Sequence, residues 1–188
     1  MALAVPPSIA ITLAINPPNF RIGADDVELS VTVVFSTSYP ITIFTWPNIL
    51  NPGLAQLRGN LQGFDRDTGK PLPMHSMDMK RVPYSYVLGG LDDEFFVTLE
   101  PGKPAKFNVS FGLAHDRGGD NGQFALPGHW YLLDVAPGEE VEWWKKGRKE
   151  DVLDLPGQPS RGAYYADGKP ISLSIDEPVE FKVLPLDD

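Results

Sequence analysis

The sequence contains no cysteine among its 188 residues. Disulfide bonds and thiolate metal ligands are therefore excluded, and a secreted protein of this size would lack its usual cross-links. The segment from Met1 to Val5 carries no basic residue, and Pro6 and Pro7 interrupt the apolar stretch that a signal peptide needs. We expect a reducing, cytoplasmic location; the alternative is a mature form from which a signal has been removed.

Basic charge is also scarce, because 16 lysines and arginines stand against 25 acidic residues and give a net charge of −9. Such a chain repels phosphate backbones and anionic membrane surfaces at long range. The sequence has no apolar run long enough to span a bilayer. We therefore expect neither a nucleic-acid nor a membrane partner.

Sequence motifs of catalysis and cofactor binding are missing as well. The serines form no Gly-x-Ser-x-Gly elbow, and Gly118-Gly119 lacks the strand-turn-helix context of a phosphate-binding loop. We expect no cofactor, and no motif identifies an enzyme class.

Proline and glycine are abundant, with 19 and 18 residues, and they separate short segments in which apolar and polar residues alternate. This period of two is typical of strands with one face in a core. The segments that carry it include Ile9 to Ile15, Val27 to Phe35, Ile41 to Trp46 and His129 to Val135. About nine strands with frequent turns predict an all-β protein, a single antiparallel β-sandwich that forms one domain over residues 1–188.

Two hairpins and one irregular segment complete the expected fold. Asp67-Thr68-Gly69 predicts a hairpin turn between flanking strands. Residues 95–99 and 107–113 are expected to pair as a second hairpin across Glu100-Pro101-Gly102-Lys103-Pro104. Glu139 to Lys169 is too long for a simple connection and predicts a decorated loop or an extra hairpin, and Leu54 to Leu57 allows at most one helical turn.

Two turn-and-strand motifs resemble the end of immunoglobulin-like sandwiches. They are Leu99-Glu100-Pro101-Gly102 and Leu126-Pro127-Gly128-His129-Trp130-Tyr131-Leu132. The resemblance implies an immunoglobulin-like fold and no particular function. The chain departs from antibody domains in having no cysteine pair, while Trp46 stands near the position of their buried tryptophan.

Histidines are the candidates for acid–base chemistry near neutral pH. His129 with Asp134, or His115 with Asp116, would provide an imidazole and a carboxylate for proton transfer. The same region suggests a divalent-metal site formed by His115, Asp116, Asp120 and His129, although the spacing matches no known metal loop. A polar, glycine-rich turn explains these residues equally, so no metal is expected.

Aromatic residues offer a stronger binding signal. Trp143, Trp144, Tyr164 and Tyr165 lie within the Glu139 to Lys169 segment, among several basic residues. Adjacent strand residues point to opposite faces, so Trp143 and Trp144 cannot enter the same core. Interfaces favour such aromatic anchors, and Trp130 would join them in lining a pocket. The competing interpretation is that this segment folds back as a lid over a sheet face.

Three functions follow from these observations. The first is a non-catalytic module that binds a protein partner, a second copy of itself or a small apolar ligand through aromatic-rich loops. The alternative is an enzyme of small-molecule metabolism with a sandwich pocket and a histidine–carboxylate pair. The third is a carbohydrate-binding module, because aromatic rings stack on sugars.

Overall fold

The computed structural model describes residues 7–72, 74, 83–113, 125–173 and 175–186. Its strands are β1 (Ser8–Asn16), β2 (Asn19–Phe20), β3 (Glu28–Ser36), β4 (Ile41–Phe44), β5 (Leu61–Asp65), β6 (Pro71–Leu72), β7 (Phe96–Leu99), β8 (Ala105–Ser110), β9 (Trp130–Val135), β10 (Glu140–Val141), β11 (Trp144–Lys146), β12 (Ile171–Ser172) and β13 (Val179–Val183). Its helices are α1 (Pro52–Arg58), the 3-10 turn η1 (Asp93–Phe95) and α2 (Lys149–Val152). Within these ranges, none of the helices has the length and hydropathy of a membrane-crossing helix.

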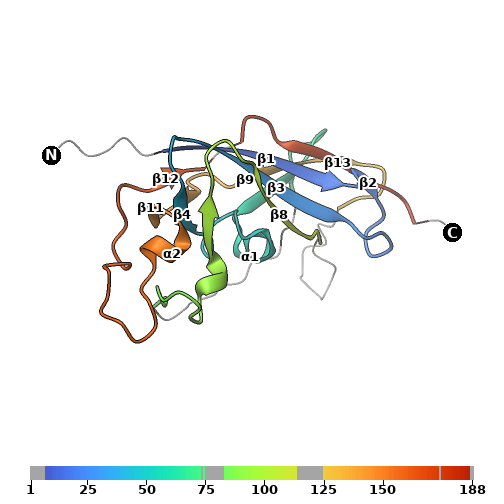
Figure 1. Ribbon diagram of the computed structural model, residues 1–188. Helices are drawn as coiled ribbons and strands as arrows, with labels where there is room; N and C mark the ends of the chain where they lie inside the picture. Colours follow the sequence, from blue (N-terminus) through green and yellow to red (C-terminus); the bar gives the residue numbers. More distant parts are fainter. Residues whose placement is uncertain (1–6, 73, 75–82, 114–124, 174, 187–188) are drawn as a thin grey trace.

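Strands make up 39% of the structure and helices 9%, which confirms the all-β class. The strands form four hydrogen-bonded sheets, in the orders β1-β3-β8, β11-β4-β7, β10-β12 and β2-β13-β9-β5-β6. The two long strands β1 and β3 lie side by side along the molecule (Figure 1). The predicted hairpin around Gly69 is confirmed by the antiparallel pairing of β5 with β6.

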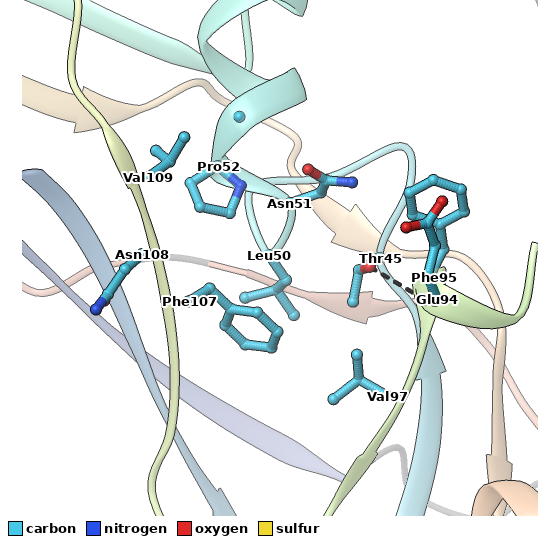
Figure 2. A pocket seen from close by; sticks show the side chains of 11 residues that line it. Thr45, Leu50, Asn51, Pro52, Glu94, Phe95, Val97, Phe107, Asn108 and Val109 are labelled. Atoms are coloured by element: carbon cyan, nitrogen blue, oxygen red, sulfur yellow. Dashed lines mark hydrogen bonds between the residues drawn. The ribbon is translucent and has the colours of Figure 1, made fainter.

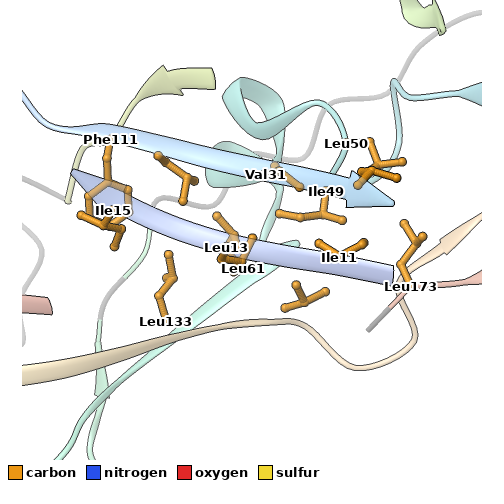
Figure 3. Packing of buried hydrophobic residues seen from close by; sticks show 14 of the residues in the cluster. Ile11, Leu13, Ile15, Val31, Ile49, Leu50, Leu61, Phe111, Leu133 and Leu173 are labelled. Atoms are coloured by element: carbon orange, nitrogen blue, oxygen red, sulfur yellow. The ribbon is translucent and has the colours of Figure 1, made fainter. Parts of the chain in front are cut away.

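The main core lies between the sheet β1-β3-β8 and the five-stranded sheet. Alternation in the sequence determines its inner faces: Leu29, Val31 and Val33 of β3 are fully buried, whereas Val34 is 40% exposed. Leu13 of β1 and Leu133 of β9 belong to the same buried cluster. Figure 3 shows Leu13, Val31 and Leu133 among the side chains that meet between the two sheets.

A second, aromatic cluster lies on the other face of the sheet β11-β4-β7. Ile41 and Ile43 of β4 belong to the main core, whereas Phe44 and Phe96 belong to the second cluster together with Trp143. This sheet therefore has buried residues on both faces, which explains why all four residues of β4 are buried.

The predicted hairpin between residues 95–99 and 107–113 is wrong. β7 pairs with β4, whereas β8 pairs with β3, so the two strands belong to different sheets. The connection between them contains Pro101 and Pro104, which have no N–H group to continue a ladder. β3 and β4 lie in these two different sheets, so β8 pairs with β3 in one sheet and β7 pairs with β4 in the other.

Helix α1 is longer than the single turn expected from the sequence. The Asn51 side chain accepts a hydrogen bond from Leu54 N, and Pro52 stands at the start of the helix, where its missing N–H costs nothing. Gly59 ends the helix in the left-handed conformation, with φ of 77°. Two turns of helix thus separate β4 from β5.

The segment from Glu139 to Lys169 is partly regular. β10 pairs with β12, and β11 pairs with β4 at the edge of its sheet, with Trp144 opposite Ile43. The short helix α2 follows, and the chain then loops away from it before returning to β12 (Figure 1). The segment therefore supplies strands to two sheets in addition to a loop.

Candidate functional site

A groove of about 410 Å³ lies between β7 and β8, the two strands that were expected to pair. Figure 2 shows β8 along one side, β7 along the other, and the start of α1 above them. Its lining residues are Thr45, Leu50, Asn51, Pro52, Gly53, Glu94, Phe95, Val97, Phe107, Asn108 and Val109. The volume falls within the range of about 300–1,000 Å³ that is common for ligand sites.

The floor of the groove is a turn between β4 and α1 that side chains hold in place. Asn48 donates from Nδ2 to Phe44 O at 3.0 Å, and its Oδ1 accepts from Leu50 N at 3.0 Å. Leu50 is 1% exposed and packs into the main core beneath the groove. Ile49 N donates to the carboxylate of Glu139 at 3.0 Å.

Glu139 is the charged group that supports this floor. Its carboxylate also accepts a hydrogen bond from Asn60 Nδ2. Burial raises the pKa of Glu139 above its usual value, against the opposing effect of these two hydrogen bonds. Glu139 thus connects the start of β10 to the turn that carries Leu50.

The walls come from strands at the ends of their sheets. β8 is the last strand of β1-β3-β8, and β7 is the last strand of β11-β4-β7. Phe107, Val109 and Val97 are only half-buried, although each packs against the main core. The groove therefore has an apolar interior with a small number of polar groups at its rim.

The electrostatics of the groove are simple. Glu94 is the charged residue of the described lining, which contains no lysine or arginine. Glu94 is exposed at the β7 side, next to Phe95 (Figure 2). An occupant would therefore meet an apolar surface with one carboxylate beside it.

The predicted aromatic set divides into buried and exposed members. Trp143 and Trp144 are 6% and 3% exposed, and they enter two different clusters on opposite faces of the sheet. Their indole N–H groups donate to Ala163 O at 3.0 Å and to Lys169 O at 2.9 Å. Both tryptophans therefore link the loop to the sheet by a hydrogen bond.

Tyr164 and Tyr165 are the exposed members, at 66% and 70%. Their rings contact each other edge-on at 5.4 Å, and Tyr164 contacts Tyr86 in the same way at 5.5 Å. Burial raises the pKa of the Tyr86 hydroxyl. Neither exposed tyrosine lines the groove.

Trp130 lies on the outer face of β9, away from the main core. The guanidinium carbon of Arg66 lies 5.1 Å from its ring centroid, and Lys182 Nζ lies 5.4 Å away. These side chains cover the indole by cation–π contact. The outer face of β9 is thus partly covered by the side chains of Arg66, which follows β5, and Lys182 of β13.

His129 pairs with a carboxylate that the sequence did not suggest. Its Nδ1 lies 2.7 Å from Asp65 Oδ2, and the other oxygen of Asp65 accepts from Asp67 N and Thr68 N. The His129 bond, followed by the turn amides, lowers the pKa of Asp65 to about 2. Asp134 lies near the far end of β9, where its Oδ1 accepts from Val135 N.

The remaining predicted residues His115, Asp116 and Asp120 lie outside the described residues. In the part of the chain that the structure describes, no group of three histidine or acidic side chains is arranged to hold a metal ion. His129 and Asp65 do not line the groove.

Sequence reasoning missed Asp65 and the groove for different reasons. The alternation of Leu61, Gly63 and Asp65 places Asp65 on the inner side of β5. A carboxylate at an inward-facing position indicates that it needs a polar partner, and this was the signal for Asp65 in the sequence. The groove depends on which strands pair, and alternation does not encode the partner.

A scan against protein-family models found no matching family, and searches of curated proteins and of solved structures found no match to this chain.

Proposed function

We propose that the chain is a non-catalytic binding module and that the groove between β7 and β8 is its ligand site. The observation that carries the proposal is the apolar interior formed by Phe107, Val97 and Val109, half-buried above the closed floor at Leu50. Concave apolar surfaces with few polar groups are the usual form of ligand sites. The acid–base alternative has less support, because the pair formed by His129 and Asp65 lies outside this groove.

Filling the groove tests the proposal. Val97→Phe adds a ring to the β7 wall, and we expect it to abolish binding of the neutral dye Nile red and of any apolar metabolite that raises the melting temperature. Val34→Phe is the matched control, because it makes the same change on the outer face of β3, where Val34 is 40% exposed and does not line the groove. Equal dye binding by Val97→Phe, Val34→Phe and the parent protein would overturn the proposal, provided that all three unfold at similar temperatures.

A second candidate surface is the exposed pair Tyr164 and Tyr165. Tyrosines bury much area at low entropic cost, which suits a protein partner or a second copy. The double change to serine is expected to lower the mass measured by light scattering if this surface makes a dimer. A melting temperature raised by sugars in the parent, and lost in this variant, would favour the carbohydrate-binding alternative instead.

The immunoglobulin-like sandwich and the cytoplasmic location are also proposals. The packing of β1-β3-β8 against the five-stranded sheet supports the first. A crystal structure compared with immunoglobulin-like domains tests it. The location is tested by imaging a tagged chain in its source cell.

A further inference from the structure

The free edge of β8 faces the groove. Its hydrogen bonds to β3 show which residues direct their backbone N–H and C=O groups toward this edge. Phe111 N donates to Val27 O at 2.7 Å, on the side where β8 meets β3. Backbone groups of alternate residues point to opposite sides of a strand. The N–H and C=O groups of Lys106, Asn108 and Ser110 therefore point away from β3.

The end of this edge is covered by one side chain that imitates a strand. Gln56 of α1 donates from Nε2 to Ser110 O at 3.1 Å, and its Oε1 accepts from Gly112 N at 3.0 Å. A carboxamide presents one donor and one acceptor, as a peptide group does. Gln56 is 8% exposed, so this edge contact is part of the folded core.

The next part of the edge has no such cover. In the described part of the chain, no residue makes a hydrogen bond to the outward backbone groups of Lys106 and Asn108. These two residues supply two donors and two acceptors next to the groove. Open strand edges are the sites at which extended peptides add as a further strand.

We propose that the groove holds an extended peptide segment that adds to the edge of β8 at Lys106 and Asn108. The inference rests on the proposed function of the groove and names its ligand class. Alternate side chains of the added strand point the same way, so apolar residues at every second position would contact Phe107, Val97 and Val109. The other side chains face solvent.

The charges of the groove further define the peptide. Glu94 stands at the β7 side, and the described lining holds no basic residue to neutralise it. The chain as a whole carries a net charge of −9. A basic residue near the Glu94 end would therefore be attracted, and an acidic one would be repelled.

The test begins with a phage-displayed library of random eight-residue peptides, selected on the full chain. We expect the selected peptides to alternate apolar and polar residues and to carry a lysine or arginine. Synthetic copies of the best peptide, N-methylated at one position at a time, are then titrated. Methylation at every second residue is expected to weaken binding about fivefold per lost hydrogen bond, whereas methylation between these positions has little effect.

Two variants at one position isolate the backbone of β8. Asn108→Pro removes the outward N–H and leaves the bonds to β3, because that N–H points away from β3. Asn108→Ala removes the same side chain and keeps the N–H. We expect Asn108→Pro to bind at least fivefold more weakly than Asn108→Ala. The N-methylated peptides use the parent protein, so their result stands even if the proline variant unfolds.

Each other outcome overturns the inference in a recognisable way. Failure to select any peptide, or binding that is insensitive to N-methylation, would exclude strand addition. A dimer in light scattering that Asn108→Pro converts to a monomer would make a second copy the occupant. If Val97→Phe abolishes Nile red binding while no peptide binds, the groove remains a ligand site and only the strand inference fails.

Discussion

At the scale of single residues, Asp65 shows how a carboxylate can serve a turn and a histidine together. One oxygen accepts from Asp67 N and Thr68 N, and the other lies 2.7 Å from His129 Nδ1. The side chain of Asp65 is 9% exposed, whereas that of His129 is 37% exposed. The pair therefore joins the start of β9 to the turn after β5.

This arrangement predicts a loss of stability in acid. The pKa of Asp65 is lowered from 3.8 to about 2 in the folded chain, so its stabilisation is complete above about pH 4 and is lost as the pH falls towards 2. Asp65→Asn should therefore cost about 2 kcal/mol of unfolding free energy at neutral pH. The difference from the parent should shrink towards pH 2, as measured by urea unfolding at each pH.

Asp67→Asn is the matched control, because Asp67 lies two residues away and its side chain is 63% exposed. We expect its stability to follow that of the parent across the same range. Profiles for Asp65→Asn and the parent that run parallel from pH 5 to pH 2 would contradict the role assigned to Asp65.

At the scale of elements, β11 and the residue before it join the loop between α2 and β12 to two hydrophobic clusters. Trp144 lies in the main core and Trp143 in the aromatic cluster. Asp167 N donates to Trp144 O at 3.0 Å, so the returning loop lies directly against the strand. Gly168 fits there because it has no side chain: a Cβ atom would lie 2.7 Å from Trp144 Cζ2.

Gly168→Ala should therefore destabilise the protein. The buried indole is held by its bond to Lys169 O, so either the ring or the loop must shift, at a cost of about 1–3 kcal/mol. Gly112→Ala is the control, because a Cβ atom there meets nothing within 4 Å. Urea unfolding followed by tryptophan fluorescence measures both, and equal midpoints for the two variants would disprove the close contact.

At the scale of the whole molecule, the sequence was sufficient for the fold class and insufficient for the pairing. Alternation in residues 9–15 and 27–35 correctly predicted β1 and β3, since burial of one face imposes that period. The short turn between the segments that became β7 and β8 suggested a hairpin, and this prediction was wrong. Each segment pairs instead with a strand from earlier in the chain, β7 with β4 and β8 with β3. The groove arises from this difference, so no local pattern could predict it.

The aromatic residues illustrate the same limit at the candidate site. The adjacency of Trp143 and Trp144 indicated that they do not share one core, but one of them was expected to cover the sheet or face a partner, whereas both are buried in separate clusters. Their burial depends on the loop segment of residues 163–169, which is remote from them in sequence but contacts them in the fold. Exposure of Tyr164 and Tyr165 likewise follows from where that loop segment lies, and sequence composition does not specify it.

The placement of β7 and β8 in separate sheets also affects how the chain reaches its fold. Val31 pairs with Phe107, and Ile43 pairs with Val97, so both ladders join segments that are far apart in sequence. Neither ladder can form until a long loop has closed, and the entropic cost of that closure comes before any free energy is gained from pairing.

We expect refolding in milliseconds to seconds in stopped-flow tryptophan fluorescence. Completion within microseconds would contradict this expectation. Because β7 and β8 share no ladder, the groove takes shape only when their two sheets pack on the common core.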